Sequence, residues 1–226
     1  MRKKLSIKNS TFATIEDGEY DILSETSLDV VFVGANPDVS KMWYESEWSD
    51  DREASTPDCF SLDGKTPSKA SVSPQNDVCA LCPRNAWGSK ITPQGFKVKD
   101  CSDIKRVAII LADKPKEGVC LLHITPSSLK NLNTYHKTLS MRGIVPEICK
   151  TTLCFDEEVN YPRLKFKFGG FNNDTTQKYV DKILGSEEVK LITGELLAQD
   201  KQPTTADDFG FSEEVGYTTD NKSEDL

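Results

Sequence analysis

The sequence of 226 residues predicts a mainly β, α+β protein. We expect an OB-fold-like five-stranded barrel with an inserted four-cysteine zinc loop, flanking helices and a disordered acidic C-terminal tail. The predicted strands do not alternate with helices, as a parallel α/β sheet would require. One helix falls between the third and fourth strands, and four cysteines cluster between the first and second. We therefore expect one domain over residues 1–201, with the insertion at about 56–103, and a flexible tail over 202–226.

Five segments have the pattern of β-strands, because apolar runs or apolar–polar alternation are bounded by glycine and proline. They are Leu28–Val33, Arg106–Leu111, Val119–Ile124, Ile148–Phe155 and Tyr161–Phe168. The second and third are predicted to form a hairpin around residues 114–118. In the fifth, apolar side chains alternate with cations, which predicts one side against a core and a basic row with no acid nearby on the other.

Helix signals follow the third and the fifth strands. Thr125-Pro126 supplies an N-cap and a proline at the first helical position, for a helix that runs to about Met141. Asn173 is predicted to cap a second helix that ends near Leu184. Residues 187–197 fit either a helix or a strand.

Two N-terminal segments have weaker patterns. Residues 1–8 are predicted to be a loose basic arm. Ser40–Trp48 is predicted to be a short helix or turn, whose aromatic side chains either stack on a ligand or pack against the core.

Charge is distributed unevenly along the chain. The formal net charge is -8, which excludes a protein that coats duplex DNA through bulk positive charge. Residues 15–58 and 202–226 are strongly acidic, whereas residues 59–143 carry an excess of Lys and Arg. The basic part contains the cysteine cluster, so a cationic surface is expected around it.

The cysteine spacing predicts a metal site. The pattern is Cys59-x19-Cys79-x2-Cys82-x18-Cys101, and an x2 gap lets one tight turn present two thiolates to one ion. Structural zinc is the expected metal, since zinc takes four thiolates readily and its binding energy can fold a loop that has little apolar content. An iron–sulfur cluster and four unligated thiols are the alternatives. A redox Cys-x2-Cys pair is disfavoured because Pro83 follows it and no helical pattern does.

The basic part also contains the ingredients of a single-strand binding surface, which are cations for phosphates and aromatic rings for bases. The candidate DNA contacts are Arg84, Trp87, Lys90, Phe96, Lys97, Lys99, Arg163, Lys165 and Lys167. The alternative for Trp87 is packing against the metal loop. The last three residues could equally form a plain solvated face.

Catalytic motifs are absent from the sequence, including the Walker loop, the Gly-x-Ser-x-Gly elbow and the zinc-deaminase signature. We therefore expect no enzyme. A zinc-ribbon adaptor that binds only protein is the main alternative function, and a metal-dependent carboxylate nuclease is a weaker one.

Two blocks of this sequence resemble a known family. Cys79-Ala-Leu-Cys82-Pro-Arg-Asn-Ala-Trp87-Gly-Ser and the later block that contains Pro126-Ser-Ser-Leu-Lys130 and Pro162-x-Leu164-x-Phe166 are similar to motifs of single-stranded-DNA-binding proteins of tailed bacteriophages, of the Drc-like type. The resemblance covers roughly residues 55–170. It implies an OB-type core, sequence-tolerant binding of single-stranded DNA (ssDNA) and a role in phage replication or transcription.

The expected partners are ssDNA and, through the acidic tail, phage replication proteins or RNA polymerase. Phe209, Phe211 and Tyr217 lie among the acids of that tail and offer apolar contacts to a partner. No apolar run is long enough to span a membrane, so no membrane association is expected. The resemblance places the protein in the cytoplasm of an infected bacterial host.

Overall fold

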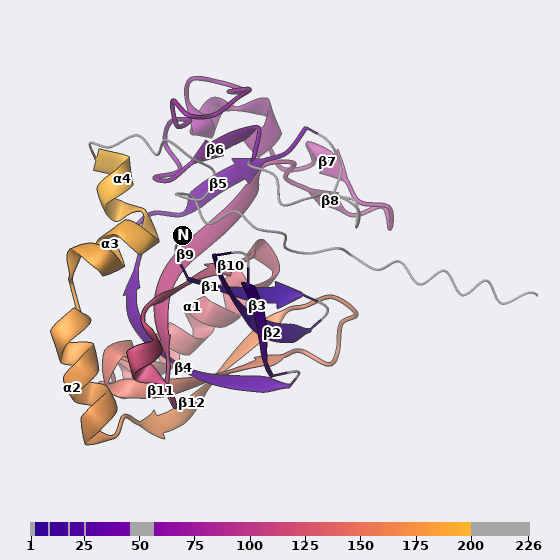
Figure 1. The fold of residues 1–226 in the computed structure, drawn as a ribbon. Helices are drawn as coiled ribbons and strands as arrows, with labels where there is room; N and C mark the ends of the chain where they lie inside the picture. The colour runs from indigo at the N-terminus through magenta and orange to yellow at the C-terminus, as the bar shows by residue number, and fades with distance from the viewer. Residues whose placement is uncertain (1–2, 9, 18, 25, 46–56, 200–226) are drawn as a thin grey trace, which may run out of the picture.

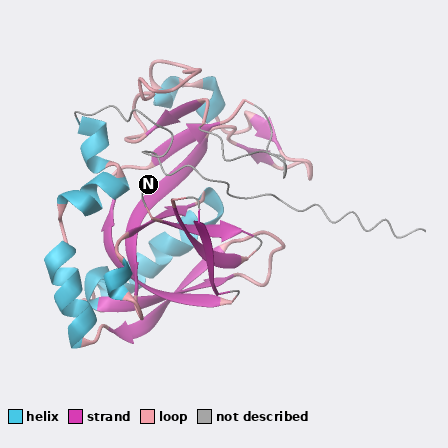
Figure 2. Ribbon diagram, in the orientation of Figure 1, coloured by secondary structure: helices cyan, strands magenta, loops and turns pink. Residues whose placement is uncertain are grey.

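The computed structural model describes residues 3–8, 10–17, 19–24, 26–45 and 57–199 (Figure 1). The predicted tail at 202–226 and part of the acidic segment 15–58 lie outside the described residues. The protein is mainly β, with a sheet that curls into a half-barrel and a small number of helices against it (Figure 2). In the described part of the chain, no helix has the length and apolar character needed to cross a membrane.

Within the described ranges, ten strands form the main sheet. They are β1 Lys4–Lys8, β2 Thr11–Glu16, β3 Glu19–Ser24, β4 Ser27–Ala35, β5 Ser40–Trp43, β6 Cys59–Ser61, β9 Ser102–Leu111, β10 Cys120–Ile124, β11 Cys149–Phe155 and β12 Leu164–Phe171. Along the sheet the order is β12-β11-β4-β9-β10-β1-β2-β3, with β5 pairing the start of β9 and β6 pairing β5. The strands β7 Lys90–Ile91 and β8 Lys97–Val98 form a separate hairpin.

Four α-helices accompany the sheet in the described residues. They are α1 Pro126–Met141, α2 Asp174–Ile183, α3 Glu187–Thr193 and α4 Glu195–Gln199. The predicted helices at Pro126 and Asn173 are confirmed, and the ambiguous segment 187–197 is helical. Ser186 accepts a hydrogen bond from the Val189 amide at the start of α3, and Gly194 ends that helix in the left-handed conformation at φ 84°.

All five predicted strands are present as β4, β9, β10, β11 and β12. The predicted hairpin is the antiparallel pair β9–β10, and α1 lies between β10 and β11 in the chain. These five strands are neighbours in the order β12-β11-β4-β9-β10. Beyond β10 the sheet continues through β1, which pairs parallel with it.

The two N-terminal predictions were wrong. Residues 4–8 are not a loose arm but the strand β1, because Leu5 and Ile7 alternate with polar residues and bury their side chains in the barrel. Ser40–Trp43 is the strand β5 rather than a helix or turn, since β6 and β9 supply hydrogen-bonding partners that are distant in sequence.

Both faces of the central strands are buried. Inside the half-barrel, α1 covers the core with Leu132, Tyr135 and Leu139, and Phe12 stacks on Phe155 with ring centroids 4.5 Å apart. On the outer face, α2 and α3 cover β4, β9 and β10; their contacts are Val180, Ile183, Val189 and Ile192 against Val31, Val33, Ile110 and Leu121. Two-sided burial explains why these strands are nearly continuous apolar runs.

A buried arginine attaches α3 to the sheet. Arg106 of β9 is 2 % exposed and donates hydrogen bonds to the carbonyls of Thr193 and Ile192 at the C-terminus of α3. Asn36 Nδ2 donates to the same Thr193 carbonyl and to Leu62 O. The partial negative charge of a helix C-terminus stabilises a cation there. The hydrogen bonds to these carbonyls therefore offset the free-energy cost of burying the guanidinium.

Candidate metal centre and nucleic-acid interface

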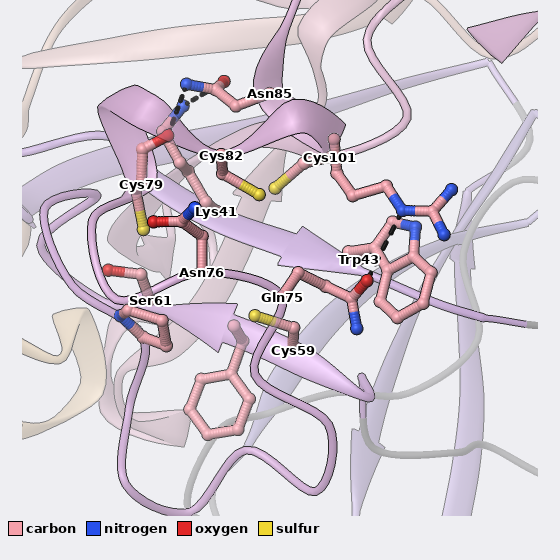
Figure 3. A pocket seen from close by; sticks show the side chains of 13 residues that line it. Lys41, Trp43, Cys59, Ser61, Gln75, Asn76, Cys79, Cys82, Asn85 and Cys101 are labelled. Atoms are coloured by element: carbon pink, nitrogen blue, oxygen red, sulfur yellow. Dashed lines mark hydrogen bonds between the residues drawn. The ribbon is translucent and has the colours of Figure 1, made fainter. Parts of the chain in front are cut away.

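The four clustered cysteines line one pocket (Figure 3). Cys59 begins β6, Cys79 begins a 3-10 turn at Cys79–Leu81, Cys82 follows that turn, and Cys101 precedes β9. Cys59, Cys79 and Cys101 are each 8 % exposed, and Cys82 is half-buried. The four predicted ligands therefore line the same pocket, although they come from separate segments of the chain.

Backbone hydrogen bonds hold these segments together. The Cys82 amide donates to Cys79 O at 3.3 Å, and Asn85 donates twice, from its amide to Cys82 O and from Nδ2 to Cys79 O. The Cys101 amide donates to Arg84 O at 2.9 Å, which joins the two ends of the loop. The x2 turn is thus rigid with respect to the fourth cysteine.

Three thiols of the pocket resist ionisation. Burial raises the pKa of Cys59, Cys79 and Cys101, and neighbouring cysteine thiolates raise each of them further; for Cys101 the pKa rises to about 12. Lys41 opposes this effect at Cys79 and Cys101. A divalent cation would reverse this balance, because a coordinated thiol is deprotonated outright.

The donor set matches zinc in chemistry and number, since four cysteine sulfurs are a common structural zinc site. As the side chains stand, no group of three or more His, Cys, Asp or Glu within the described ranges is arranged to hold a metal ion. The pocket brings the sulfurs together without closing them into a tetrahedron.

A tryptophan that the sequence did not single out for this role supports the pocket. Trp43 of β5 is 3 % exposed and packs with Cys59 and Cys101. Its Nε1 donates to Asp100 Oδ2 at 2.7 Å. The alternative predicted for Trp87, packing against the metal loop, is the role that Trp43 has. No signal in the sequence distinguishes the two, because β5 reaches the loop only through its pairing with β6 and β9.

Arg84 and Lys99 are committed to ion pairs within the loop. The Arg84 guanidinium lies 4.7 Å from the centre of the Trp43 ring, and its Nη1 is 3.0 Å from Asp100 Oδ2. Lys99 Nζ donates to Asp103 Oδ2 at 2.9 Å, and Lys41 pairs with the same carboxylate. Burial alone would raise the pKa of Asp103, but the hydrogen bonds from Lys41 and Lys99 outweigh burial and lower it.

The β7–β8 hairpin carries exposed aromatic and basic side chains. Trp87 is 75 % exposed and Phe96 is 69 % exposed. The hairpin strands contribute Lys97, which is exposed, and Lys90, which is half-buried with its Nζ 4.0 Å from Asp100 Oδ1. Gly88 N donates to Val98 O at 3.1 Å, which fixes the start of the hairpin beside Trp87. Both rings therefore stand in solvent on a supported segment.

The basic row on β12 is less free than the sequence predicted. Asp156 pairs with Arg163 and with Lys165, so the expectation of no acid nearby was wrong. The hydrogen bond from Lys165 is the main reason that the Asp156 pKa falls to about 2, with a further contribution from Arg163. The sequence could have shown this, because an antiparallel β11–β12 hairpin places residue 156 at its connection. Lys167 is exposed on the same strand.

The candidate DNA contacts thus form two groups. One surrounds the cysteine pocket and the β7–β8 hairpin, and the other lies on β12 at the far end of the sheet (Figure 1). No family model, no curated protein and no solved structure matches this chain.

Proposed function

We propose that the protein is a non-enzymatic ssDNA-binding protein with a four-cysteine zinc loop that supports phage DNA replication or transcription. The observation that carries this proposal is the β7–β8 hairpin, where Trp87 and Phe96 are exposed beside Lys90 and Lys97. Trp87, Ile91 and Phe96 are all exposed on this one short segment, and grouped apolar side chains offer a surface to a ligand with an apolar face. Nucleobases provide that face and phosphates match the lysines.

The order of the strands is consistent with this function. The order β12-β11-β4-β9-β10, with α1 between β10 and β11, supports a proposed OB-type core in which β4 and β9 would be the first two strands. The cysteine loop is then an insertion between these two strands. In place of the usual closure by the fifth strand, β1 pairs parallel with β10.

The zinc ion would have a structural role. Cys59, Cys79, Cys82 and Cys101 would hold it, and its binding energy would stabilise a loop that has only short strands and 3-10 turns of its own. The ion would fix Arg84, Trp87 and the hairpin in the positions that contact DNA. The acidic segment 202–226 is proposed to recruit phage replication proteins or RNA polymerase.

A gel-shift experiment tests the function. Labelled single-stranded and double-stranded oligonucleotides of the same sequence are titrated with the full chain, with and without magnesium. We expect the single strand to shift selectively, without cleavage and without a need for magnesium. No shift with either strand would favour the zinc-ribbon adaptor that binds only protein, and magnesium-dependent products would favour the nuclease.

A further inference from the structure

The strand β12 ends in a β-bulge. Phe168 pairs with Thr151 of β11 and Phe171 pairs with Cys149, so two residues of β12, Gly169 and Gly170, lie opposite one residue of β11. In a regular strand, side chains three residues apart point to opposite faces. The extra residue places the two phenylalanines on the same face.

The two glycines are required by this geometry. Gly170 has φ +97°, a conformation that side-chain-bearing residues rarely adopt. A Cβ on Gly169 would lie 2.9 Å from Thr152 Oγ1 and 3.3 Å from the Lys150 main-chain oxygen. The sequence Phe-Gly-Gly-Phe is therefore suited to bringing the two rings together rather than to extending a strand.

The rings of Phe168 and Phe171 form an exposed pair. Their centroids are 5.4 Å apart and their planes make an angle of 78°. Along the same face of β12, Leu164 is 2 % exposed and Phe166 packs on Tyr135 and Phe32, but Phe168 is 38 % and Phe171 is 61 % exposed. Their partners on β11, Thr151 and Cys149, are fully buried, whereas neither ring belongs to the hydrophobic core cluster.

The charge of this edge favours an anionic ligand. The strands β11 and β12 contain Lys150, Lys165 and Lys167 and no Asp or Glu. Lys165 is paired with Asp156, and the acid closest in sequence before β11 is Glu147. In the sheet that the described residues form, β12 is the terminal strand, so one of its backbone edges faces outward. At Leu164 this edge is covered by α1, because the Leu164 amide donates to Ser128 Oγ and Asn131 Nδ2 donates to Leu164 O. Side chains alternate along β12, so Lys165 and Lys167 point to the face opposite the rings. A single strand of nucleic acid that wraps around the outer edge of β12 would place bases on the rings and phosphates near these lysines.

We propose that Phe168 and Phe171 are a second base-stacking site for ssDNA, separate from the β7–β8 hairpin. The proposal rests on the proposed function and extends it, because it assigns stacking to a pair of residues at the far end of the sheet. A DNA strand that contacts both the β7–β8 hairpin and the Phe168–Phe171 pair would run across the protein surface from the cysteine loop to β12.

The experiment measures the affinity for a labelled oligo-dT by fluorescence anisotropy. The variants are Phe168→Leu, Phe171→Leu and the double variant, which keep an apolar side chain and remove the aromatic face. Tyr20→Leu is the matched control, since Tyr20 is 47 % exposed on β3 beside acidic residues. We expect each single variant to bind about tenfold more weakly and the double variant about 100-fold more weakly, with the control unchanged.

A second measurement is independent of any substitution. The wild-type chain is photocrosslinked to an oligonucleotide that contains 5-iododeoxyuridine, and the crosslinked peptides are identified by mass spectrometry. A crosslink at Phe168 or Phe171 supports the site. If the wild type binds ssDNA but the double variant binds equally well and the pair gives no crosslink, the inference is overturned while the proposed function stands. A double variant that changes only the association state in sedimentation would assign the pair to a protein contact and likewise overturn it. If the wild type does not bind ssDNA, the proposed function itself fails.

Discussion

Arg106 Nε donates a hydrogen bond to the main-chain carbonyl of Thr193 at 3.1 Å, across 87 residues of sequence. The same guanidinium donates from Nη2 to Ile192 O at 2.9 Å. Its Nη1 lies 3.3 Å from Nε2 of His123. One buried side chain thus joins two neighbouring strands to the end of α3. Gly194 makes this possible, because a Cβ there would approach Arg106 Nε to 3.2 Å.

Replacing Arg106 should destabilise the fold. Arg106→Met keeps most of the volume but removes the side-chain donor of Ile192 O and leaves Thr193 O with Asn36 alone, so we expect the free energy of unfolding to fall by about 2–4 kcal/mol. Urea denaturation followed by circular dichroism measures this change, and Lys137→Met on the exposed face of α1 is the control. A loss of less than about 0.5 kcal/mol, the size typical of a surface substitution, would show that the cap contributes little.

Stability should decrease in mild acid because of His123. Burial, with Lys4 and Arg106 nearby, lowers the pKa of His123 well below 6.5, so the folded protein keeps the ring neutral. The unfolded chain takes up a proton near pH 6.5. Stability is therefore fully present above that pH and falls below it, by about 1.4 kcal/mol at pH 5.5 for this group. His136, whose pKa burial also lowers, adds to the trend.

The measurement is urea unfolding at pH 7.5 and pH 5.5. His123→Gln cannot titrate, so the difference in unfolding free energy between the two pH values should be smaller in this variant than in the wild type. An equal difference in both proteins would assign the acid sensitivity to other groups.

The metal prediction concerns content and stability. The purified chain should contain about one zinc ion, and Cys82→Ser should lose it together with part of the thermal stability, since structural zinc supplies folding free energy. Cys154→Ser, a half-buried cysteine outside the pocket, should retain the ion. Elemental analysis and a thermal melt with and without chelator provide the readout. Stoichiometric zinc in Cys82→Ser would exclude Cys82 as a ligand.

Trp87 should be the strongest single contact of the hairpin. Trp87→Leu removes the most exposed aromatic ring among the described residues, and we expect a loss of about 1–3 kcal/mol in binding of oligo-dT with no change in unfolding free energy. Quenching of tryptophan emission by oligo-dT should shrink in the same variant, since it removes one of the three tryptophans, and Trp43 is only 3 % exposed. Unaltered affinity and quenching would remove Trp87 from the interface.

The salt dependence of binding should distinguish Lys97 from Lys165, which already forms an ion pair with Asp156. Lys97→Gln is expected to reduce the slope of log Kobs against log salt concentration by about 0.7, the contribution of one phosphate contact on a single strand. Lys165→Gln should change the slope less, because Lys165 already neutralises Asp156 in the free protein. Equal slopes for the wild type and Lys97→Gln would contradict a phosphate contact at Lys97.

The sequence predicted the parts of the fold that depend on local patterns. The apolar runs of β4, β9 and β10, the proline that begins α1 and the asparagine that caps α2 are all readable within a few residues. The strand β5 could not be read in this way, since its partners β6 and β9 are distant in sequence. The strand β1 was missed although Leu5 and Ile7 alternate with polar residues and its antiparallel partner β2 follows directly. The cysteine spacing identified four residues that share a pocket, but the supporting ring, Trp43, comes from a strand whose pairing the sequence does not reveal.

The short strand β6 sets a limit on how this chain can be divided. Cys59 contributes to the pocket, while its neighbour Phe60 is 2 % exposed and, with Leu62, packs against Met42 and Leu197 of α4. Phe60, which packs against α4, is therefore the residue next to Cys59 of the cysteine pocket. The cysteine loop is not a transplantable module: a shortened chain that lacks it would leave α4 without its apolar contacts, and a fragment that ends before α4 would uncover the base of the loop.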